Sequence, residues 1–363
     1  MTSMNDEALA SPPPPPPKPA SAGWRPRLLA LGVSLLFAAL LAELALRIMG
    51  VGYGHAPIVG HPVYHHWHPG DYQMRVWSHP AEFGGFNASF NSQGMSGKAE
   101  LPPPGTPSIV FLGDSFTEAL QVPEDRRYVA QVSSALGLAP VNLGCSSFTP
   151  LLSRLNLETF ADRLSPAVVV LQIFSNDVGD DVELRKHATV GGAGRVTAAP
   201  GEQTSLSVRL ARQSYLARLI RKTTLTIEHT REMNQRSGGA WQVVPWPSSF
   251  TRPMEEWFSP PERQGFETSV SEIRDLCKAR GWPLVVWAVP DRGAVLRGER
   301  DWYYEYQQAL AARLGIPFLD VAKAFPKEKL RELFFGFDIH FNERGHAAVA
   351  ELLAREIKPF VRR

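Results

Sequence analysis

The chain has 363 residues, a formal net charge of +2 and a sequence pI of about 8.5. Because lysine and arginine are scattered, the composition argues against a nucleic-acid-binding protein. The two cysteines, Cys145 and Cys277, form neither a metal-binding pattern nor a disulfide framework. We expect two small semi-buried side chains, with a single bridge as the alternative if the domain lies in an oxidising compartment.

The first 27 residues are polar and low in complexity, and they contain the proline run Pro12–Pro17. Such a segment lacks the apolar side chains that a packed core needs, so residues 1–27 are predicted to be a disordered, polyproline-like tail.

An apolar stretch follows from Leu28 to Met49. As a helix it would be roughly 33 Å long, which is enough to cross a bilayer. Arg25 and Arg27 precede it and favour a cytoplasmic N-terminus, with the rest of the chain periplasmic or extracellular. The alternatives are a cleaved signal peptide, for which no clean cleavage site follows, and a buried helix of a soluble fold.

Residues 50–106 are predicted to form a juxtamembrane segment with short strands at Tyr72–Trp77 and Gly85–Asn91 and a turn at 91–94. The proline-rich stretch Leu101–Pro107 marks a boundary, and residues 107–363 form the main domain.

In the main domain, short apolar runs alternate with helical patterns. Because the runs are apolar throughout, they predict a five-stranded parallel sheet in a three-layer α/β/α sandwich of the flavodoxin-like type. An insertion is expected at about 178–261. The predicted strands are 109–112, 141–143, 168–173, 284–289 and 317–319, and the predicted helices are 125–137, 150–164, 205–232, 262–280, 301–314 and 343–358.

Four short polar motifs fall at the ends of these strands or at the start of the last helix. They are Gly113-Asp-Ser115, Asn142-Leu-Gly144, Phe174-Ser-Asn-Asp177 and Asp338-Ile-His340. Each alone is typical of a turn or helix cap. Together, in this order and at strand-to-helix junctions, they indicate one site at the carboxyl edge of the sheet.

This arrangement resembles the GDSL/SGNH hydrolase superfamily over most of residues 108–360. The resemblance implies that Ser115 is the nucleophile, that Gly144 and Asn176 belong to the second and third motifs, and that His340 is the base. The stretches AELALRIMG and NSQGMSG are similar to those of membrane-anchored bacterial members.

The chemistry of these residues agrees with the resemblance. A serine hydroxyl needs a base within hydrogen-bond reach, which His340 can supply while Asp338 orients its ring. The backbone N–H groups of Ser115 and Gly144 and the amide of Asn176 could form an oxyanion hole. The family pattern differs at two places: Phe174 replaces a glycine, and Phe337 stands where the aspartate is usual. Asp320 is therefore a reserve candidate for the acid.

Several other residues have an ordinary structural interpretation beside a functional one. The histidines His65, His66 and His68 lack accompanying acidic or cysteine ligands, so a solvated or membrane-proximal loop is expected instead of a metal site. Asp114 is interpreted as a turn-former and His346 as structural. Arg292 is a candidate for facing the site from the loop after the fourth strand. Three tryptophans could line a substrate pocket or, alternatively, pack the insertion; they are Trp241, Trp246 and Trp257.

The sequence thus predicts a membrane-anchored, extracytoplasmic serine esterase that cleaves small acyl groups, such as acetyl, from a cell-surface glycan. No cofactor or metal is expected. Three alternatives remain open at this point: an O-acetyltransferase using the same residues, a non-catalytic envelope module that binds glycan or a partner, and an intracellular lipase-like enzyme if the apolar segment is no anchor.

Overall fold

A computed structural model describes residues 23–54, 57–78, 81–237 and 248–362. The predicted tail lies almost entirely outside the described residues, as does the proline run. The chain divides into two compact units, the first ending at Ala45 and the second beginning at Leu46.

The first unit consists of most of helix α1, Trp24–Ile48. Among the described residues, α1 is the one helix that is long and apolar enough to cross a membrane. It begins four residues before the predicted apolar stretch, with Pro26 in its first turn, where a missing N–H costs no helical hydrogen bond.

The second unit starts with small sheets in the juxtamembrane segment. Strands β4 (Tyr72–Trp77) and β5 (Gly84–Phe90) pair as an antiparallel hairpin, close to the predicted strands, and β1 (Tyr53–Gly54) joins β4 in parallel. A second, two-stranded sheet pairs β2 (Val59–Gly60) with β3 (His66–Trp67). The predicted turn follows β5, where the Asn91 carbonyl accepts the Gly94 N–H at 2.9 Å.

The central sheet has four parallel strands in the order β11-β8-β6-β7. The strands are β6 (Ser108–Leu112), β7 (Ala139–Asn142), β8 (Pro166–Ile173) and β11 (Leu284–Ala288). The predicted fifth strand at 317–319 is not formed as a strand. Only Phe318 bridges to Val286, because the chain turns away after two backbone hydrogen bonds.

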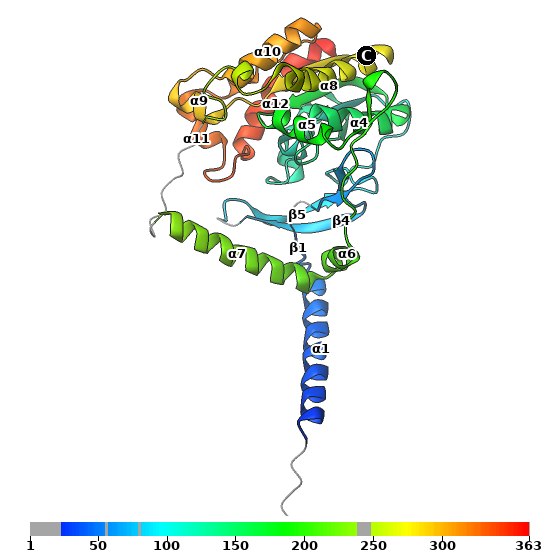
Figure 1. Ribbon diagram of the computed structural model, residues 1–363, viewed down its shortest axis with the longest axis vertical. Coiled ribbons are helices and arrows are strands. Elements are labelled where there is room, and N and C mark those ends of the chain that lie inside the picture. The colour runs from blue at the N-terminus through cyan, green and yellow to red at the C-terminus, as the bar shows by residue number, and fades with distance from the viewer. Residues whose placement is uncertain (1–22, 55–56, 79–80, 238–247, 363) are drawn as a thin grey trace, which may run out of the picture. The chain divides into compact units, whose positions relative to one another are not determined.

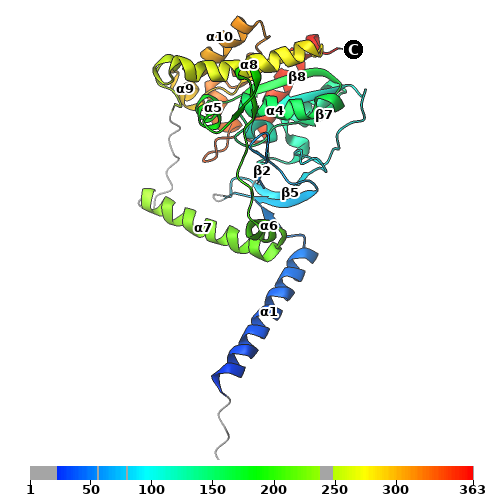
Figure 2. The same cartoon turned by 45° about the vertical axis from the view of Figure 1, so that its right-hand side comes forward.

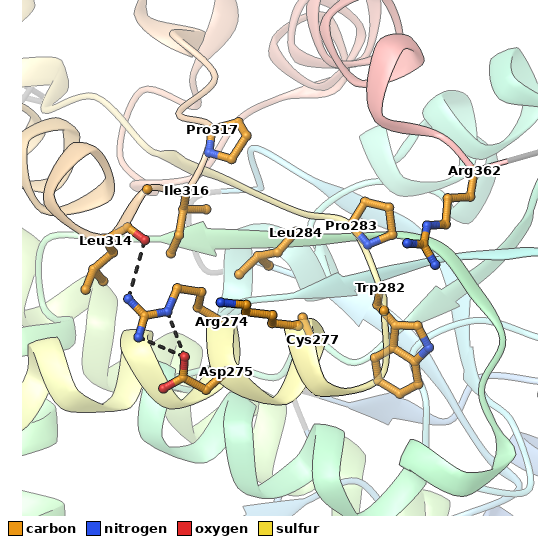
Figure 3. Close-up of a pocket in the computed structure, with 13 residues that line it drawn as sticks. Arg274, Asp275, Cys277, Trp282, Pro283, Leu284, Leu314, Ile316, Pro317 and Arg362 are labelled. Atoms are coloured by element: carbon orange, nitrogen blue, oxygen red, sulfur yellow. Dashed lines mark hydrogen bonds and ion pairs between the residues drawn. The ribbon is translucent and has the colours of Figure 1, made fainter.

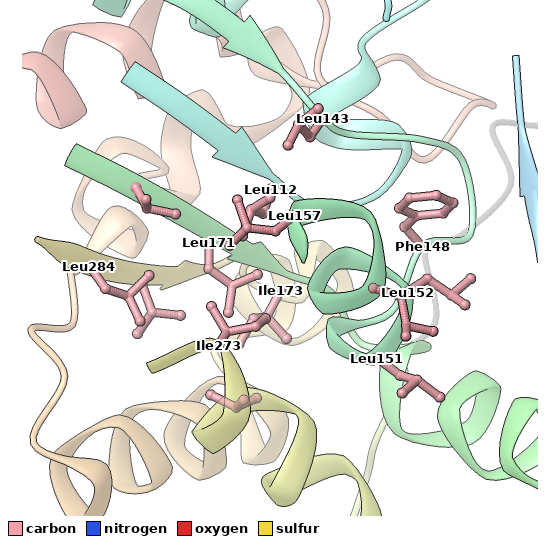
Figure 4. Close-up of a cluster of buried hydrophobic side chains, with 14 of the residues drawn as sticks. Leu112, Leu143, Phe148, Leu151, Leu152, Leu157, Leu171, Ile173, Ile273 and Leu284 are labelled. Carbon is pink, nitrogen blue, oxygen red and sulfur yellow. The ribbon is translucent and has the colours of Figure 1, made fainter. Parts of the chain in front are cut away.

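Helices cover both faces of this sheet, as Figures 1 and 2 show. Along β6, Val110 and Leu112 pack into one apolar cluster, whereas Ile109 and Phe111 pack into another, as the alternation of a strand requires. The first cluster, part of which is drawn in Figure 4, includes side chains of α4 (Pro150–Phe160) and α8 (Pro260–Ala279). The second includes side chains of α3 (Tyr128–Leu136) and α12 (Glu343–Ile357). The three-layer α/β/α prediction is confirmed.

Among helices of at least six residues, the structure agrees with the predictions apart from three differences. The predicted helix 205–232 is two helices, because Ser214 adopts an extended conformation between α6 and α7. The short helices α5 and α9 were not predicted. The helices of the second unit with at least six residues are α3 (Tyr128–Leu136), α4 (Pro150–Phe160), α5 (Asp177–Arg185), α6 (Leu206–Gln213), α7 (Tyr215–Ser237), α8 (Pro260–Ala279), α9 (Arg292–Arg297), α10 (Trp302–Leu314) and α12 (Glu343–Ile357).

The expected insertion contains β9 (Thr189–Val190) and β10 (Val196–Ala198), which pair with each other, followed by α6 and α7. Ala199, just after β10, bridges to Tyr64 of the juxtamembrane segment.

The strand order creates a switch point between β6 and β8. From β6 the chain moves to β7 on one side, and it then returns to β8 on the other side. The connections therefore diverge at the carboxyl ends of these two strands, where open α/β sheets leave a crevice for ligands.

Candidate active site

Ser115 stands at this switch point because the chain turns sharply after β6. Gly113 has φ +150°, and a Cβ there would lie 2.4 Å from both Gln172 Oε1 and Thr117 Oγ1. Only glycine fits such a conformation in so little space. Asp114 then caps α2 (Ser115–Glu118) by accepting the Phe116 N–H at 2.8 Å. Ser115 is thereby placed at the first position of a short helix, half-buried at the edge of the sheet.

The structure brings Ser115 and His340 into contact, although 225 positions separate them. His340 Nε2 lies 2.6 Å from Ser115 Oγ, and His340 Nδ1 lies 2.5 Å from Asp338 Oδ1. When the carboxylate accepts the Nδ1 proton, Nε2 is left with a lone pair directed at the serine hydroxyl. This is the geometry of a nucleophile, a base and an orienting acid.

Asp338 is suited to remain ionised beside the imidazole. Burial opposes its charged form, but the hydrogen bonds and positive charge of His340, together with the charge of Arg292, hold the pKa of Asp338 below its ordinary value. Asp338 Oδ1 also accepts the His340 backbone N–H at 2.9 Å, which fixes the carboxylate against its own loop.

The loop that carries Asp338 and His340 is held by two side chains from other elements. Glu82, in the turn between β4 and β5, accepts the N–H groups of Phe337 and Asp338 at 2.8 and 2.9 Å. Arg292, at the start of α9, donates to the Asp338 carbonyl at 2.7 Å. A carboxylate thus fixes the N–H side of the loop, and a guanidinium fixes its carbonyl side.

At its other end, this loop runs into helix α12. The Asn342 side chain accepts the N–H groups of Arg344 and Gly345 at 3.0 and 3.1 Å, so it caps the helix two residues after His340. The His340 ring packs against Phe116, with the ring centroids 4.7 Å apart. Both contacts restrict where the imidazole can lie.

Two of the three predicted oxyanion-hole donors already hold hydrogen bonds within the protein. The Gly144 N–H donates to Asn142 Oδ1 at 3.0 Å, and Asn176 Nδ2 donates to Asp180 Oδ2 at 2.6 Å. An amide NH₂ has two protons, so Asn176 keeps one for another acceptor, whereas Gly144 has only one. The Ser115 N–H finds no acceptor within the part of the chain that the structure describes.

Gly144 has a steric role as well. A Cβ at this position would lie 2.6 Å from Thr117 Cβ and 2.9 Å from the Glu118 backbone nitrogen. Its glycine therefore allows the loop after β7 to approach the helix that begins at Ser115.

The reserve acid and the second histidine lie elsewhere. Asp320 accepts the Tyr304 hydroxyl at 2.8 Å and pairs with Lys323 at 3.2 Å. His346 is buried in α12, where its Nδ1 accepts the Tyr128 N–H at 3.3 Å, and burial lowers its pKa to about 3. Neither side chain has a hydrogen bond to His340 or Ser115 among the described residues.

The expectation of a solvated histidine loop is wrong for His66 and His68, which are 6% and 2% exposed. His66 bonds to the Ser146 carbonyl at 2.7 Å, and His68 pairs with the buried Glu118 at 2.5 Å. The juxtamembrane segment therefore packs against the loops that follow β6 and β7. His65 is half-buried, and its ring contacts that of His66. No metal-binding cluster of three or more such residues occurs within the described ranges.

The remaining candidates have structural positions. Cys145 and Cys277 are both buried and free, so the alternative of a bridge is not formed. Trp257 is exposed and packs edge-on against Phe250, whereas Trp241 and Trp246 lie outside the described residues.

A cavity of about 650 Å³ lies away from Ser115, His340 and Asp338, and Figure 3 shows the residues that line it. Its lining includes Cys277, Trp282, Leu284 and Pro317. Leu284 is the first residue of β11, so the cavity is at the amino edge of the sheet, opposite the edge that carries Ser115.

Sequence reasoning missed two residues of this site. Gln121 Nε2 lies 3.1 Å from His340 Nδ1, and Glu82 fixes the histidine loop from outside the main domain. Neither belongs to a motif, and both are more than 200 positions from His340. Arg292, at the start of α9, could be named as a candidate from the sequence because it comes shortly after the apolar strand β11.

The chain is similar to several solved structures at low sequence identity. No curated protein matches the chain. Solved structures that match include a lipolytic protein of the G-D-S-L family from Desulfitobacterium hafniense, with 14% identity, a TM-score of 0.38, and coverage of 69% of this chain and 99% of that one. A variant of Axe2, an acetyl-xylooligosaccharide esterase from Geobacillus, has 17% identity, a TM-score of 0.37, and coverage of 73% and 100%.

The model of the GDSL-like lipase/acylhydrolase family matches residues 111–348, which span the four motifs from Gly113 to His340. The central parallel sheet and the polar motifs at its carboxyl edge agree with that match. The chain therefore belongs to the GDSL-like lipase/acylhydrolase family and is a serine hydrolase that acts on ester bonds.

Proposed function

We propose that the protein is a membrane-anchored, extracytoplasmic esterase in which Ser115 is the nucleophile, His340 the general base and Asp338 the orienting acid. The observation that carries this proposal is the contact chain from Ser115 Oγ to His340 Nε2 at 2.6 Å and from His340 Nδ1 to Asp338 Oδ1 at 2.5 Å.

The reaction proceeds in two halves. Ser115 Oγ attacks the ester carbonyl carbon while its proton passes to His340 Nε2, and the imidazolium is stabilised by Asp338. The C–O bond to the leaving alcohol breaks as His340 returns the proton to that oxygen, which leaves an acyl group on Ser115. Water, deprotonated by His340, then attacks the acyl carbon, and Ser115 regains the proton as the acid leaves.

The negative oxygen of the tetrahedral intermediate is stabilised by the Ser115 N–H, the second Asn176 amide proton and the Gly144 N–H. For Gly144 this requires that Asn142 Oδ1 give up its hydrogen bond when the oxyanion forms. Each donor is expected to lower the barrier by about 3 kcal/mol.

We further propose that the substrate is a small acyl ester, such as an acetyl group, on a cell-surface glycan. Support comes from the accessibility of the site: Ser115 is partly exposed, Asn176 is exposed, and Ile339, beside the base, is 44% exposed. An ester on a large polymer must reach its nucleophile at the protein surface.

The anchor in this proposal is α1, with the N-terminus in the cytoplasm. Arg25 and Arg27 lie at the N-terminal end of the helix, and the excess of positive charge on the cytoplasmic side of a span sets its orientation. Topology reporters fused before residue 1 and after residue 363 would test on which side of the membrane each end of the chain lies.

The central test is hydrolysis of chromogenic acetyl, butyryl and octanoyl esters by the wild-type protein and by Ser115→Ala. We expect the variant to lose activity and fluorophosphonate labelling, and the wild-type protein to prefer the acetyl ester. Ser146→Ala, which alters a serine in the loop after β7, is the matched control and should retain both. Full activity in Ser115→Ala would refute the proposed site, whereas preference for the octanoyl ester would refute only the proposed substrate.

A further inference from the structure

Helices α6 and α7 leave an apolar surface uncovered in the second unit. Leu206 and Leu210 of α6 are 69% and 61% exposed, and Ile220 and Ile227 of α7 are 59% and 47% exposed. Each pair lies on one side of its helix, because the members are four and seven positions apart. These four side chains are called the α6–α7 face below.

The opposite side of α7 is the one that packs against the protein. Arg218 donates to the carbonyls of Gly52 and Gln73 at 3.3 and 3.2 Å, and Lys222 lies over the rings of Tyr53 and Trp77. At about 100° per residue, Ile220 and Ile227 point roughly 180–200° away from Arg218. The apolar side of α7 is therefore turned away from the β1–β4 sheet.

The junction of α6 and α7 contacts the chain where α1 ends. Arg47 Nη2 donates to the Gln213 carbonyl at 2.6 Å, and the guanidinium lies over the Tyr215 ring at 4.9 Å. Arg47 is the penultimate residue of α1 and belongs to the second unit. Whatever the direction of α1, the α6–α7 face is thus close to the point at which an inserted helix would leave the bilayer.

Charge on these two helices is strongly positive. Residues 206–231 contain Glu228 as their one acidic side chain and six basic ones, so their formal charge is +5; the basic residues are Arg209, Arg212, Arg218, Arg221, Lys222 and Arg231. Arg209, Arg221 and Arg231 are exposed. Exposed leucine and isoleucine combined with arginine are typical of helices that lie in the interface of an anionic membrane.

A basic cavity lies beside α6. It has a volume of about 320 Å³, and its lining includes Arg209, Arg212, Tyr72 and Thr204. Arg212 lies about 200° from Leu210 around α6, so it faces away from the apolar side of the helix, whereas Arg209 flanks that side.

We propose that the α6–α7 face lies on an anionic phospholipid bilayer, with its leucine and isoleucine side chains at the boundary between headgroups and acyl chains. Arg209 and Arg221 contact lipid phosphates beside it. The proposal rests on the proposed anchoring by α1, because the anchor brings this surface to the bilayer. The contact holds the second unit against the membrane and limits how far Ser115 can reach from it.

The experiment uses the full chain in nanodiscs that contain phosphatidylglycerol and brominated phosphatidylcholine, which quenches nearby fluorophores. A thiol-reactive bimane is attached to Leu210→Cys, Ile220→Cys or, as the control, Gln308→Cys. Gln308 is exposed on α10, which lies at the far end of the second unit from α6 and α7 in Figures 1 and 2. Cys145 and Cys277 are 0% and 1% exposed, so the native thiols should not label.

We expect fluorescence at Leu210→Cys and Ile220→Cys to fall about twofold or more relative to unbrominated discs, because interfacial helices lie about 5–10 Å deep, and fluorescence at Gln308→Cys to be unchanged. Adding Arg209→Glu and Arg221→Glu should reduce the quenching, as should replacing phosphatidylglycerol with neutral lipid.

A Leu36→Cys probe in α1 separates the two proposals. Quenching at Leu36→Cys without quenching at Leu210→Cys and Ile220→Cys overturns the membrane contact and leaves the anchor intact. Absence of quenching at all three overturns both. Protection of Leu210→Cys from bimane without lipid quenching would identify a protein partner or a second copy instead, and it also overturns the proposal. Ester hydrolysis, measured on the same samples, reports separately on the Ser115 site.

Discussion

Removal of the Glu82 carboxylate tests how the histidine loop is held. In Glu82→Ala, the N–H groups of Phe337 and Asp338 lose acceptors that lie at 2.8 and 2.9 Å. The loop keeps the Arg292 contact to the Asp338 carbonyl and the Asn342 cap, so we expect it to shift without unfolding. A shift of Asp338 moves the imidazole that it orients.

The size of the effect follows from these contacts. Hydrogen bonds to a charged group contribute about 1.5–3 kcal/mol when buried, but Glu82 is partly exposed and water can replace part of what is lost. If the displaced loop raises the activation free energy by about 1.4–2 kcal/mol, the rate falls roughly 10–30-fold. The loss should appear in kcat more than in KM, since Glu82 contacts the loop and not the proposed nucleophile.

The assay is steady-state hydrolysis of a chromogenic acetyl ester, with Glu82→Gln and Glu100→Ala measured beside Glu82→Ala. Glutamine keeps one acceptor oxygen and should recover part of the rate. Glu100 also accepts a backbone N–H, from Ser92 at 3.0 Å, and it has no hydrogen bond to the histidine loop among the described residues. Glu100→Ala therefore removes a similar contact without touching the loop and should leave kcat unchanged. Wild-type kcat in Glu82→Ala, or an equal loss in Glu100→Ala, would refute the reasoning.

Three further predictions concern the site itself. Asp338→Asn should reduce kcat on the order of 10³–10⁴-fold because the orienting charge is lost, whereas Asp320→Asn should stay near wild type; the reverse order would contradict the assignment of the acid. Gly144→Ala should lower the free energy of unfolding by about 1–3 kcal/mol in urea titrations, because its Cβ meets Thr117, and an unchanged midpoint would count against this packing. Burial raises the pKa of Asp114 to about 6, above an unfolded value near 3.9, so the folded protein binds more protons between those values and stability falls as pH rises through them. Asp114→Asn should remove that loss. In thermal melts, the melting temperature of the variant should rise relative to that of wild type between pH 4 and pH 7. An equal difference in melting temperature at both pH values would disprove this prediction.

The layers of the fold could be predicted because burial leaves a direct trace in sequence. Strands covered on both faces must be apolar throughout, and β6 and β8 are fully buried. The fifth strand could not be predicted reliably, since a run of three residues can pair at one position or at all three. In the structure only Phe318 forms a bridge to the sheet. The break at Ser214 also lacks a proline or glycine signal.

The candidate site divides in a similar way. The side chains of the motifs at 115, 338 and 340 could be selected because each needs a particular chemistry, and because one motif follows an apolar strand and the other precedes the last helix. The hydrogen bond that occupies the Gly144 N–H could not be predicted. Asn142 accepts it with a side chain whose Nδ2 is held by donating to the carbonyl of Thr117, a residue 25 positions away.

The sequence alone determined the apolar α1, the alternation of strands and helices, and the types of residue that can perform ester chemistry, since all three are written in local composition and order. Only the tertiary structure decided that His68 is buried against Glu118, that Glu82 fixes a loop more than 250 positions away, and that α6 and α7 each leave leucine or isoleucine side chains exposed. These are contacts between segments distant in the chain. They depend on how whole elements pack, and a local pattern carries no record of its distant partner.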